Sequence, residues 1–118
     1  AFFENVKMSE QKKIMTVSSL QGSIEGGYGE GSFFYRGSKA SLNMFMHTLS
    51  DQAKVKRSGI MVGLFSPGLV VDERTENLQL DGKVERPVSI RGMINVIENF
   101  KPGMSGGFYK YSGETVPW

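Results

Sequence analysis

The sequence contains no cysteine, and it has a single histidine, a single tryptophan and four prolines. Without cysteine the chain can form neither a disulfide framework nor a thiolate nucleophile or thiolate metal site. This absence agrees with a reducing compartment, and we expect a cytoplasmic protein. The longest apolar run, IMVGLF at 60–65, is far too short to cross a bilayer as a helix.

Neither positive nor negative charge predominates in the sequence. Fourteen basic residues face twelve acidic ones, so the formal net charge is +2. With no run of basic residues, we expect neither a nucleic acid nor a membrane as partner. A length of 118 residues suits one domain at most, so residues 1–118 are treated as a single unit, small for an enzyme that holds a dinucleotide.

Metal-ligating patterns are sparse. His47 lies off the apolar stripe of its predicted helix, and we interpret it as an exposed or partner-facing residue rather than a ligand. The acidic residues Asp72, Glu73 and Glu76 fall in an irregular polar segment and are interpreted as a solvated loop. No metal site is predicted.

What the sequence does contain is a regular alternation of strand and helix patterns. Strands are predicted at 12–19, 60–65 and 107–112, and helices at 33–55 and from Pro87 to just before Pro102. Residues 1–9 resemble the last turns of a helix, whereas 69–86 have no regular pattern. Right-handed crossovers would make this β-α-β-α-β series half of an open parallel α/β sheet, with ligands at the carboxyl ends of the strands.

Each long predicted helix carries an apolar stripe of the kind that faces a core. In the first helix the stripe consists of Leu42, Phe45, Met46, Leu49 and Ala53. In the second helix the residues expected to face inward are Ile90, Met93, Ile94 and Ile97.

A glycine-rich loop separates the first predicted strand from the first long helix. Its G-x-G pairs start at residues 27 and 29, but neither is followed three residues later by the glycine that completes a dinucleotide fingerprint. No G-x-x-x-x-G-K-[ST] phosphate loop is present either. We therefore interpret the segment as a flexible loop over a site.

Tyr35 and Lys39 are four residues apart near the start of the first long helix, so they share one helix face. An ammonium group and the positive end of a helix N-terminus both favour the ionised form of a nearby phenol. Such a pair is suited to proton transfer onto a carbonyl oxygen. The spacing alone leaves open a surface tyrosine that happens to lie beside a surface lysine.

Four motifs follow one another in the chain: SSLQGS at 18–23, YRGSKASLN at 35–43, SPGLV at 66–70 and GGFYKYSGETVPW at 106–118. In this order and at these spacings the chain resembles the short-chain dehydrogenase/reductase family, closest to the sniffer-like and C-factor-like carbonyl reductases. The resemblance implies the C-terminal half of a Rossmann-like doubly wound parallel sheet. It also implies NAD(P)-dependent reduction of small carbonyl compounds, or oxidation of the corresponding alcohols.

The resemblance assigns a role to each motif. Tyr35 would be the general acid/base, Lys39 would assist it and bind the nicotinamide ribose, and Ser19 would position the substrate carbonyl. The turn after the second strand would run past the nicotinamide of NAD or NADP. The implied cofactor contacts are Tyr35, Lys39, Pro67, Gly68 and Val70.

The N-terminal motifs of this family, T-G-x-x-x-G-x-G, N-N-A-G and a catalytic asparagine before the S-S strand, do not occur. We therefore expect the chain to be a C-terminal catalytic half that is inactive alone. The resemblance further implies a homodimer or homotetramer built on the helix that carries Tyr35. An alternative is a non-catalytic interaction or signalling module that retains this helix. Tyr109, Tyr111 and Trp118 are expected to close the substrate pocket or to pack between subunits.

Overall fold

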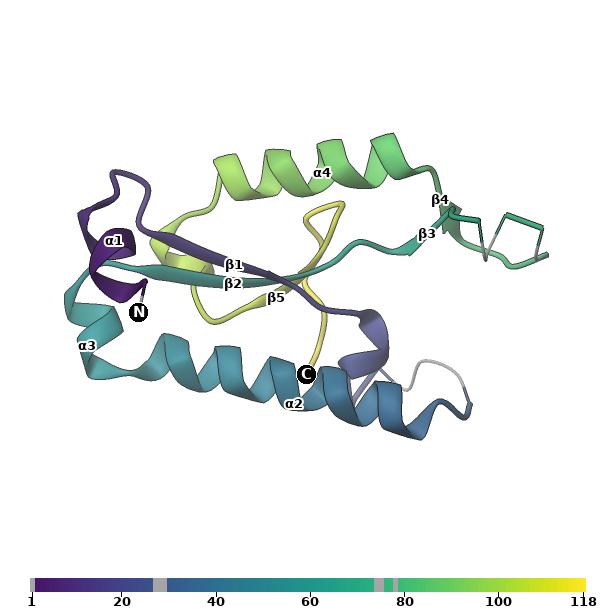
Figure 1. The fold of residues 1–118 in the computed structure, drawn as a ribbon, viewed down its shortest axis with the longest axis horizontal. Coiled ribbons are helices and arrows are strands. Elements are labelled where there is room, and N and C mark those ends of the chain that lie inside the picture. Colours follow the sequence, from purple (N-terminus) through teal and green to yellow (C-terminus); the bar gives the residue numbers. More distant parts are fainter. Residues whose placement is uncertain (1, 27–29, 74–75, 78) are drawn as a thin grey trace.

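The computed structural model describes residues 2–26, 30–73, 76–77 and 79–118, and its α/β fold has three layers (Figure 1). The middle layer is a parallel sheet in the order β1-β2-β5, formed by Lys13–Val17, Met61–Ser66 and Phe108–Lys110. Helix α4, Arg86–Glu98, covers one face of the sheet, and α2, Phe33–Asp51, covers the other. The expected parallel α/β architecture is confirmed.

Shorter elements complete the chain. Helices α1 and α3 span Phe3–Met8 and Ala53–Arg57, and the 3-10 turns η1 and η2 span Leu20–Gly22 and Pro102–Met104. The segment expected to be irregular contains two short strands, β3 at Leu69–Val70 and β4 at Lys83–Val84, which pair in parallel with each other. The G-x-G pairs of the glycine loop involve residues 27 and 29, which lie outside the described residues.

Strand β2 supplies the core on both faces of the sheet. Val62 and Leu64 pack toward the α2 side, whereas Phe65 packs with Phe100 and other residues toward the α4 side. These three β2 side chains are at most 1% exposed, and burying each contributes about 1.5–3 kcal/mol. A continuous apolar run is what a strand buried on both faces requires.

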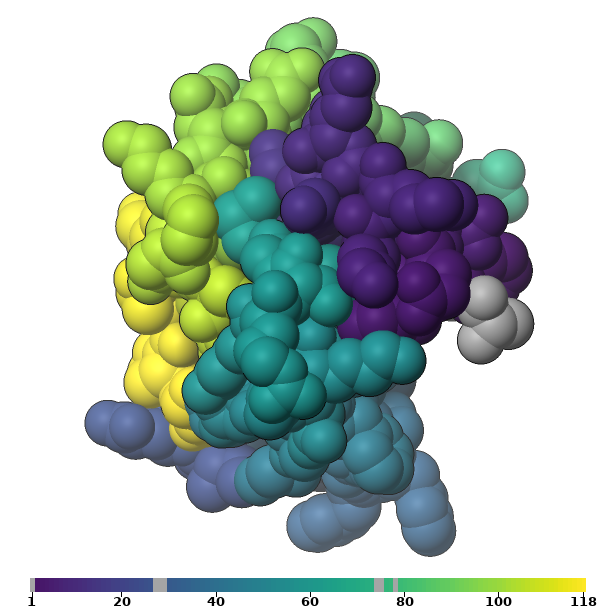
Figure 2. All heavy atoms as spheres, turned by 90° about the vertical axis from the view of Figure 1, so that its left-hand side faces the viewer, coloured from purple at the N-terminus to yellow at the C-terminus, as the bar shows by residue number. Residues whose placement is uncertain are grey.

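The amino ends of the strands form one end of the molecule, shown in Figure 2, where the N-terminal segment lies beside the segment around α3. Phe3 and Val6 of α1 pack there against Val55 and Ile60. The carboxyl ends of the same strands lie at the opposite end in Figure 1, together with η1 and the β3–β4 pair. Any ligand site of the parallel-sheet type belongs at that second end.

The apolar stripe predicted for the first helix is partly wrong. Met46 and Leu49 pack against the core, but Phe45 is 69% exposed and Ala53 belongs to a separate helix after a break at Gln52. The buried row instead includes two polar residues, Asn43 and Ser50. The Ser50 hydroxyl and the amide oxygen of Asn43 form hydrogen bonds within the protein, which helps a polar row to face the sheet.

The inward face predicted for the second helix is also partly wrong. Met93 and Ile97 pack on the core, but Ile90 and Ile94 are 45% and 49% exposed. Ser89 and Val96 are buried in their place. The hydroxyl of Ser89 donates to the carbonyl oxygen of Pro67 at 2.6 Å, and this bond fixes which side of α4 faces the sheet.

The C-terminal aromatic residues take different positions from one another. Tyr109 is a core residue that contacts Phe65 and Phe100, so neither of its expected uses applies. Trp118 stacks on Phe108 within the same chain, at 5.9 Å between ring centres. The His47 side chain is 42% exposed, which agrees with one of its two expected positions. Its ring centre lies 4.8 Å from that of Trp118, and its Nδ1 bonds to the carbonyl oxygen of Gly106.

Candidate active site

Tyr35 and Lys39 occupy the first turns of α2, as their spacing predicts. The Lys39 ammonium nitrogen lies 5.6 Å from the centre of the Tyr35 ring. Tyr35 is 48% exposed, and Lys39 is half-buried. In the described part of the chain Lys39 forms no ion pair with a carboxylate. Its ammonium group can therefore interact with the phenol and with a ligand hydroxyl.

Ser19 follows β1 directly and caps the 3-10 turn η1. Its Oγ accepts a hydrogen bond from the backbone N–H of Gln21 at 3.2 Å. A hydroxyl oxygen that accepts this bond keeps its own proton free to donate. Ser19 is therefore held in a defined orientation with a donor available.

The turn after Ser19 is joined to the turn after β2 by the buried side chain of Ser66. The Ser66 Oγ accepts hydrogen bonds from the backbone N–H of Leu20 at 3.2 Å and of Gly68 at 3.4 Å. Gly68 adopts a φ of +80°, a conformation that L side chains rarely adopt. Ser66 thus places the substrate-side and cofactor-side turns predicted from the sequence next to each other.

The η1 turn also rests directly on α2. A Cβ added at Gly22 would lie 2.9 Å from the Cβ and the carbonyl carbon of Lys39, and 2.9 Å from the Nδ2 of Asn43. Only a residue without a side chain permits this close approach. The structure therefore brings the Ser19 turn against the helix that carries Tyr35 and Lys39. Direct convergence of the three reactive groups remains a prediction.

A cavity of about 390 Å³ lies at the carboxyl ends of the strands. It is lined by Leu20, which follows Ser19, by Gly68 and Leu69, by Asp81 and Gly82, and by Lys110, Tyr111, Ser112 and Glu114. We call it the carboxyl-end cavity. Its position agrees with the expected place of a ligand in a parallel sheet. Val70, the last predicted cofactor contact, is half-buried in β3 and pairs with Val84 rather than lining this cavity.

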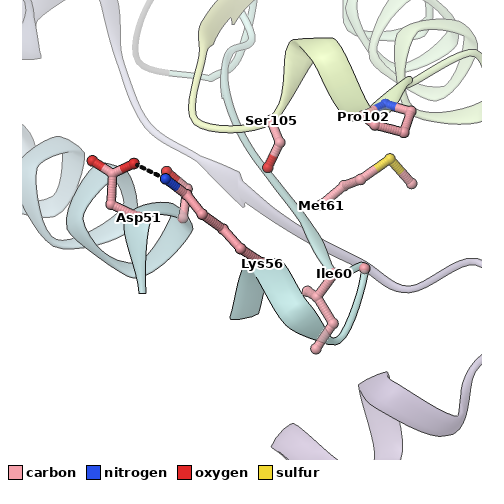
Figure 3. Close-up of a pocket in the computed structure, with 8 residues that line it drawn as sticks. Asp51, Lys56, Ile60, Met61, Pro102 and Ser105 are labelled. Carbon is pink, nitrogen blue, oxygen red and sulfur yellow. Dashed lines mark ion pairs between the residues drawn. The ribbon is translucent and has the colours of Figure 1, made fainter. Parts of the chain in front are cut away.

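A second cavity, of about 320 Å³, lies at the amino ends of the strands (Figure 3). Lys56 and Asp51 line it and pair with each other at 2.9 Å, and Met61 and Ser105 contribute to its wall. None of the predicted catalytic or cofactor-binding residues belongs to this cavity. The carboxyl-end cavity includes one of them, Gly68, whereas Ser19, Tyr35 and Lys39 line neither cavity. We place the candidate active site at the carboxyl ends of the strands, where these residues follow β1 and begin α2.

One ion pair, Lys110 with Glu114, lies in the wall of the carboxyl-end cavity. The Lys110 ammonium bonds to the carboxylate of Glu114 at 2.6 Å, and it holds the pKa of that carboxyl below its usual value. The Lys56 ammonium lowers the pKa of Asp51 in the same way at the other end of the sheet. Glu114 and Asp51 are thus ionised at neutral pH.

The described residues contain no group of three or more histidine, aspartate or glutamate side chains arranged to hold a metal ion. No helix in this part of the chain is long and apolar enough to cross a membrane.

Sequence reasoning missed three residues that shape the site. Ser18, Asn43 and Ser66 are each at most 4% exposed, and their side chains bond between elements distant in sequence. All three lie within the motifs that carry the resemblance, but a serine's partner cannot be read from sequence. Asn43 was the more visible signal, because it is a polar residue four positions after Lys39 on the same helix face.

The chain is similar to known proteins in sequence and in structure, although no family model matches it. It is 32% identical to the C-signal of Myxococcus xanthus over 118 residues, which is all of this chain and 68% of that protein. Its fold matches the NADPH-bound carbonyl reductase from chicken fatty liver with a TM-score of 0.81 at 29% identity, covering 96% of this chain and 48% of that one. The carbonyl reductase Sniffer of D. melanogaster matches with a TM-score of 0.76 at 29% identity, over 90% of this chain and 41% of that one.

The chain belongs to the short-chain dehydrogenase/reductase family. It spans about two thirds of the C-signal and less than half of each solved relative. The resemblance seen in the four motifs is thereby confirmed, as is the fold class, a parallel α/β sheet equivalent to about half of a Rossmann-like domain. The individual roles of the site residues remain predictions.

Proposed function

We propose that this chain is the catalytic C-terminal half of an NAD(P)-dependent reductase of small carbonyl compounds. The observation that carries the proposal is the arrangement at the start of α2. Tyr35 and Lys39 are stacked one helical turn apart, and the turn that follows Ser19 is packed against the same helix through Gly22. The carbonyl reductases among the structural relatives support this substrate class.

In the proposed reaction the carbonyl oxygen of the substrate accepts a hydrogen bond from Ser19 and the proton of the Tyr35 hydroxyl. The Lys39 ammonium stabilises the phenolate that remains, and the phenol is restored by a proton from solvent. The Ser19 hydroxyl helps to stabilise charge as it develops on the oxygen. When bound, the nicotinamide cofactor supplies the hydride that the carbonyl carbon receives.

The residues present fit the nicotinamide end of such a cofactor. Tyr35 and Lys39 offer a half-exposed hydroxyl and an ammonium group without a carboxylate partner in the described chain, the donor types that a ribose requires. Pro67 and Gly68 form a turn in which Gly68 adopts a φ of +80°, and a side chain at Gly68 would meet Tyr111 and Val84 at 3.0 Å. We assign the ribose to Tyr35 and Lys39, and we assign the nicotinamide side of the site to Pro67, Gly68 and Val70.

The test is an assay of NADPH and NADH oxidation with a panel of small aldehydes and ketones, in the protein at the full length that its gene encodes. We expect turnover with one of the two cofactors. Absence of turnover with every carbonyl compound, together with no binding of either cofactor, would contradict the proposed function.

A second function, a non-catalytic interaction or signalling module, is favoured by two observations. Three phenylalanines of helix α2 are exposed to solvent: Phe33 is 84% exposed, Phe34 is 97% exposed and Phe45 is 69% exposed. The C-signal of Myxococcus xanthus, of which this chain covers 68%, is a signal protein by name. We propose that in such a module this helix forms a homodimer, with no requirement for the Tyr35 hydroxyl.

The encoding gene distinguishes the two functions. About 120 upstream codons that include a glycine-rich nucleotide loop support the reductase, since the combined length is typical of one α/β domain. A stop codon or unrelated sequence upstream supports the module.

A further inference from the structure

A buried hydrogen bond joins the strand that precedes Ser19 to the helix that carries Tyr35 and Lys39. The Ser18 hydroxyl donates to the Oδ1 of Asn43 at 2.6 Å, and the two residues are 4% and 2% exposed. Asn43 follows Lys39 by one helical turn. The bond therefore links the residue before Ser19 to the helical turn after Lys39.

The same asparagine is in close contact with η1. A Cβ at Gly22 would lie 2.9 Å from its Nδ2. On the other side, the Ser18 backbone N–H donates to the carbonyl oxygen of Phe65 at 2.7 Å, which fixes the end of β1 to β2. Asn43 is thus the point where β1, η1 and α2 meet.

Asn43 makes this junction at a cost in stability. Its Nδ2 is buried and has no hydrogen-bond partner in the described part of the chain. A buried donor without a partner costs about 1–3 kcal/mol. An apolar side chain of the same size would avoid that cost but could not accept the Ser18 bond. The arrangement therefore favours a defined position of β1 on α2 over stability.

We propose that Asn43 is a positioning residue, which acts through Ser18 and Gly22 to hold the Ser19 hydroxyl in register with Tyr35 and Lys39. This inference rests on the proposed function. Acid–base and hydrogen-bond partners of a reacting oxygen must be held within a few tenths of an ångström. A misplacement of about 1 Å costs about 100-fold in rate.

The kinetic test uses Ser18→Ala, Asn43→Leu and the double variant in the protein at its full encoded length. Each single variant should lower kcat by about 10- to 100-fold with KM changed less than about threefold, because the reacting groups move while the binding surfaces remain. The double variant should be no slower than the slower single variant, since both changes break the same bond. Ser18→Thr, which retains the hydroxyl donor, should recover most of the lost rate.

Ser50→Ala is the matched control. Ser50 is also a buried serine facing the sheet from α2, but its hydroxyl donates only to the carbonyl oxygen of His47 in its own helix. We expect its kcat to equal that of the wild type. Additive losses in the double variant, no recovery in Ser18→Thr, or an equal loss in Ser50→Ala would overturn the proposal.

A second measurement decides the proposal even if the protein reduces no carbonyl compound. The backbone N–H of Gln21 bonds to the Ser19 Oγ, so its hydrogen exchange reports on that hydroxyl. In Ser18→Ala and Asn43→Leu we expect exchange at Gln21 and Gly22 to accelerate about tenfold or more. Exchange at Leu64, in the middle of the sheet, should stay unchanged. Unchanged exchange in the turn, or equal acceleration at Leu64, would show that Asn43 does not position Ser19.

Discussion

Lys39 holds its ammonium nitrogen 5.6 Å from the centre of the Tyr35 ring, one helical turn further along α2. A cation in this position interacts favourably with the aromatic ring and with a phenolate. If Tyr35 is the general acid, Tyr35→Phe removes the transferred proton and leaves the ring in place. We expect kcat for carbonyl reduction to fall at least about 100-fold. The rate of NADPH oxidation under saturating substrate measures it.

The control for this variant is Ser41→Ala, an exposed residue on the same helix. Its kcat should match that of the wild type. Near-normal turnover of Tyr35→Phe would exclude the general-acid role and would favour a non-catalytic function for α2.

Two glycines near the site should respond to alanine in opposite directions. A methyl group at Gly22 would collide with Lys39 and Asn43 at 2.9 Å, whereas nothing lies within 4 Å of the corresponding position at Gly37 in α2. Gly22→Ala should therefore lower the free energy of unfolding by about 1–3 kcal/mol. Gly37→Ala should raise it by up to about 1 kcal/mol, because alanine is the better helix former.

Urea unfolding measures both changes. Catalysis provides an independent check, since Gly22→Ala should also reduce kcat by displacing the Ser19 turn, while Gly37→Ala should not. Equal stability of the two variants would mean that η1 does not lie against α2 as described.

The order of strands and helices could be predicted because it depends on local patterns. The run at 60–65 is continuously apolar, and the structure buries it in the central strand β2. The glycine and proline residues that interrupt the patterns lie close to the ends of the elements. The relation of Tyr35 to Lys39 was also predictable, because a spacing of four residues in a helix fixes which residues are neighbours.

The rotation of the helices about their axes could not be predicted. Phe45 belongs to the most apolar stripe of α2, yet it faces away from the sheet, and Asn43 is buried instead. That choice depends on contacts between distant segments, namely the Ser18 hydroxyl and the close approach of Gly22. Hydrophobic periodicity carries no information about either partner.

Stability should decline at high pH through Tyr109. Burial raises the pKa of this phenol above its ordinary value of about 10. Because the folded state favours the neutral phenol, the contribution of Tyr109 to the free energy of unfolding is fully present below pH 10. This contribution is lost as the pH rises through the folded-state pKa. Tyr109→Phe removes this ionisation, so its free energy of unfolding should fall less than that of the wild type between pH 7 and pH 10.5.

At neutral pH the same variant should be less stable than the wild type by about 1 kcal/mol, because the Tyr109 hydroxyl donates to the carbonyl oxygen of Met104 at 3.0 Å. Tyr111→Phe removes one phenol outside the core and is the control for general alkaline effects. If Tyr109→Phe loses as much unfolding free energy at high pH as the wild type does, the decline is due to other groups.

The last prediction concerns residues 1–118 expressed alone. Among the described residues β1 pairs only with β2, and Val17 at its end is 56% exposed. In the doubly wound sheets of the family another strand would cover this edge. A bare strand edge offers unpaired backbone groups to any second chain. We therefore expect the isolated chain to self-associate, which sedimentation velocity will measure.

The isolated chain should also bind NADPH and NADH weakly. The residues assigned to the cofactor contact only its nicotinamide end, and no glycine-rich fingerprint is present for its pyrophosphate. Fluorescence titration of each cofactor gives the dissociation constant. The matched control is the same chain coexpressed with the N-terminal half of a full-length relative, which should cover the edge of β1. A monomer that binds either cofactor with a Kd in the low micromolar range would show that β1 needs no further strand and that the nicotinamide contacts are sufficient for binding.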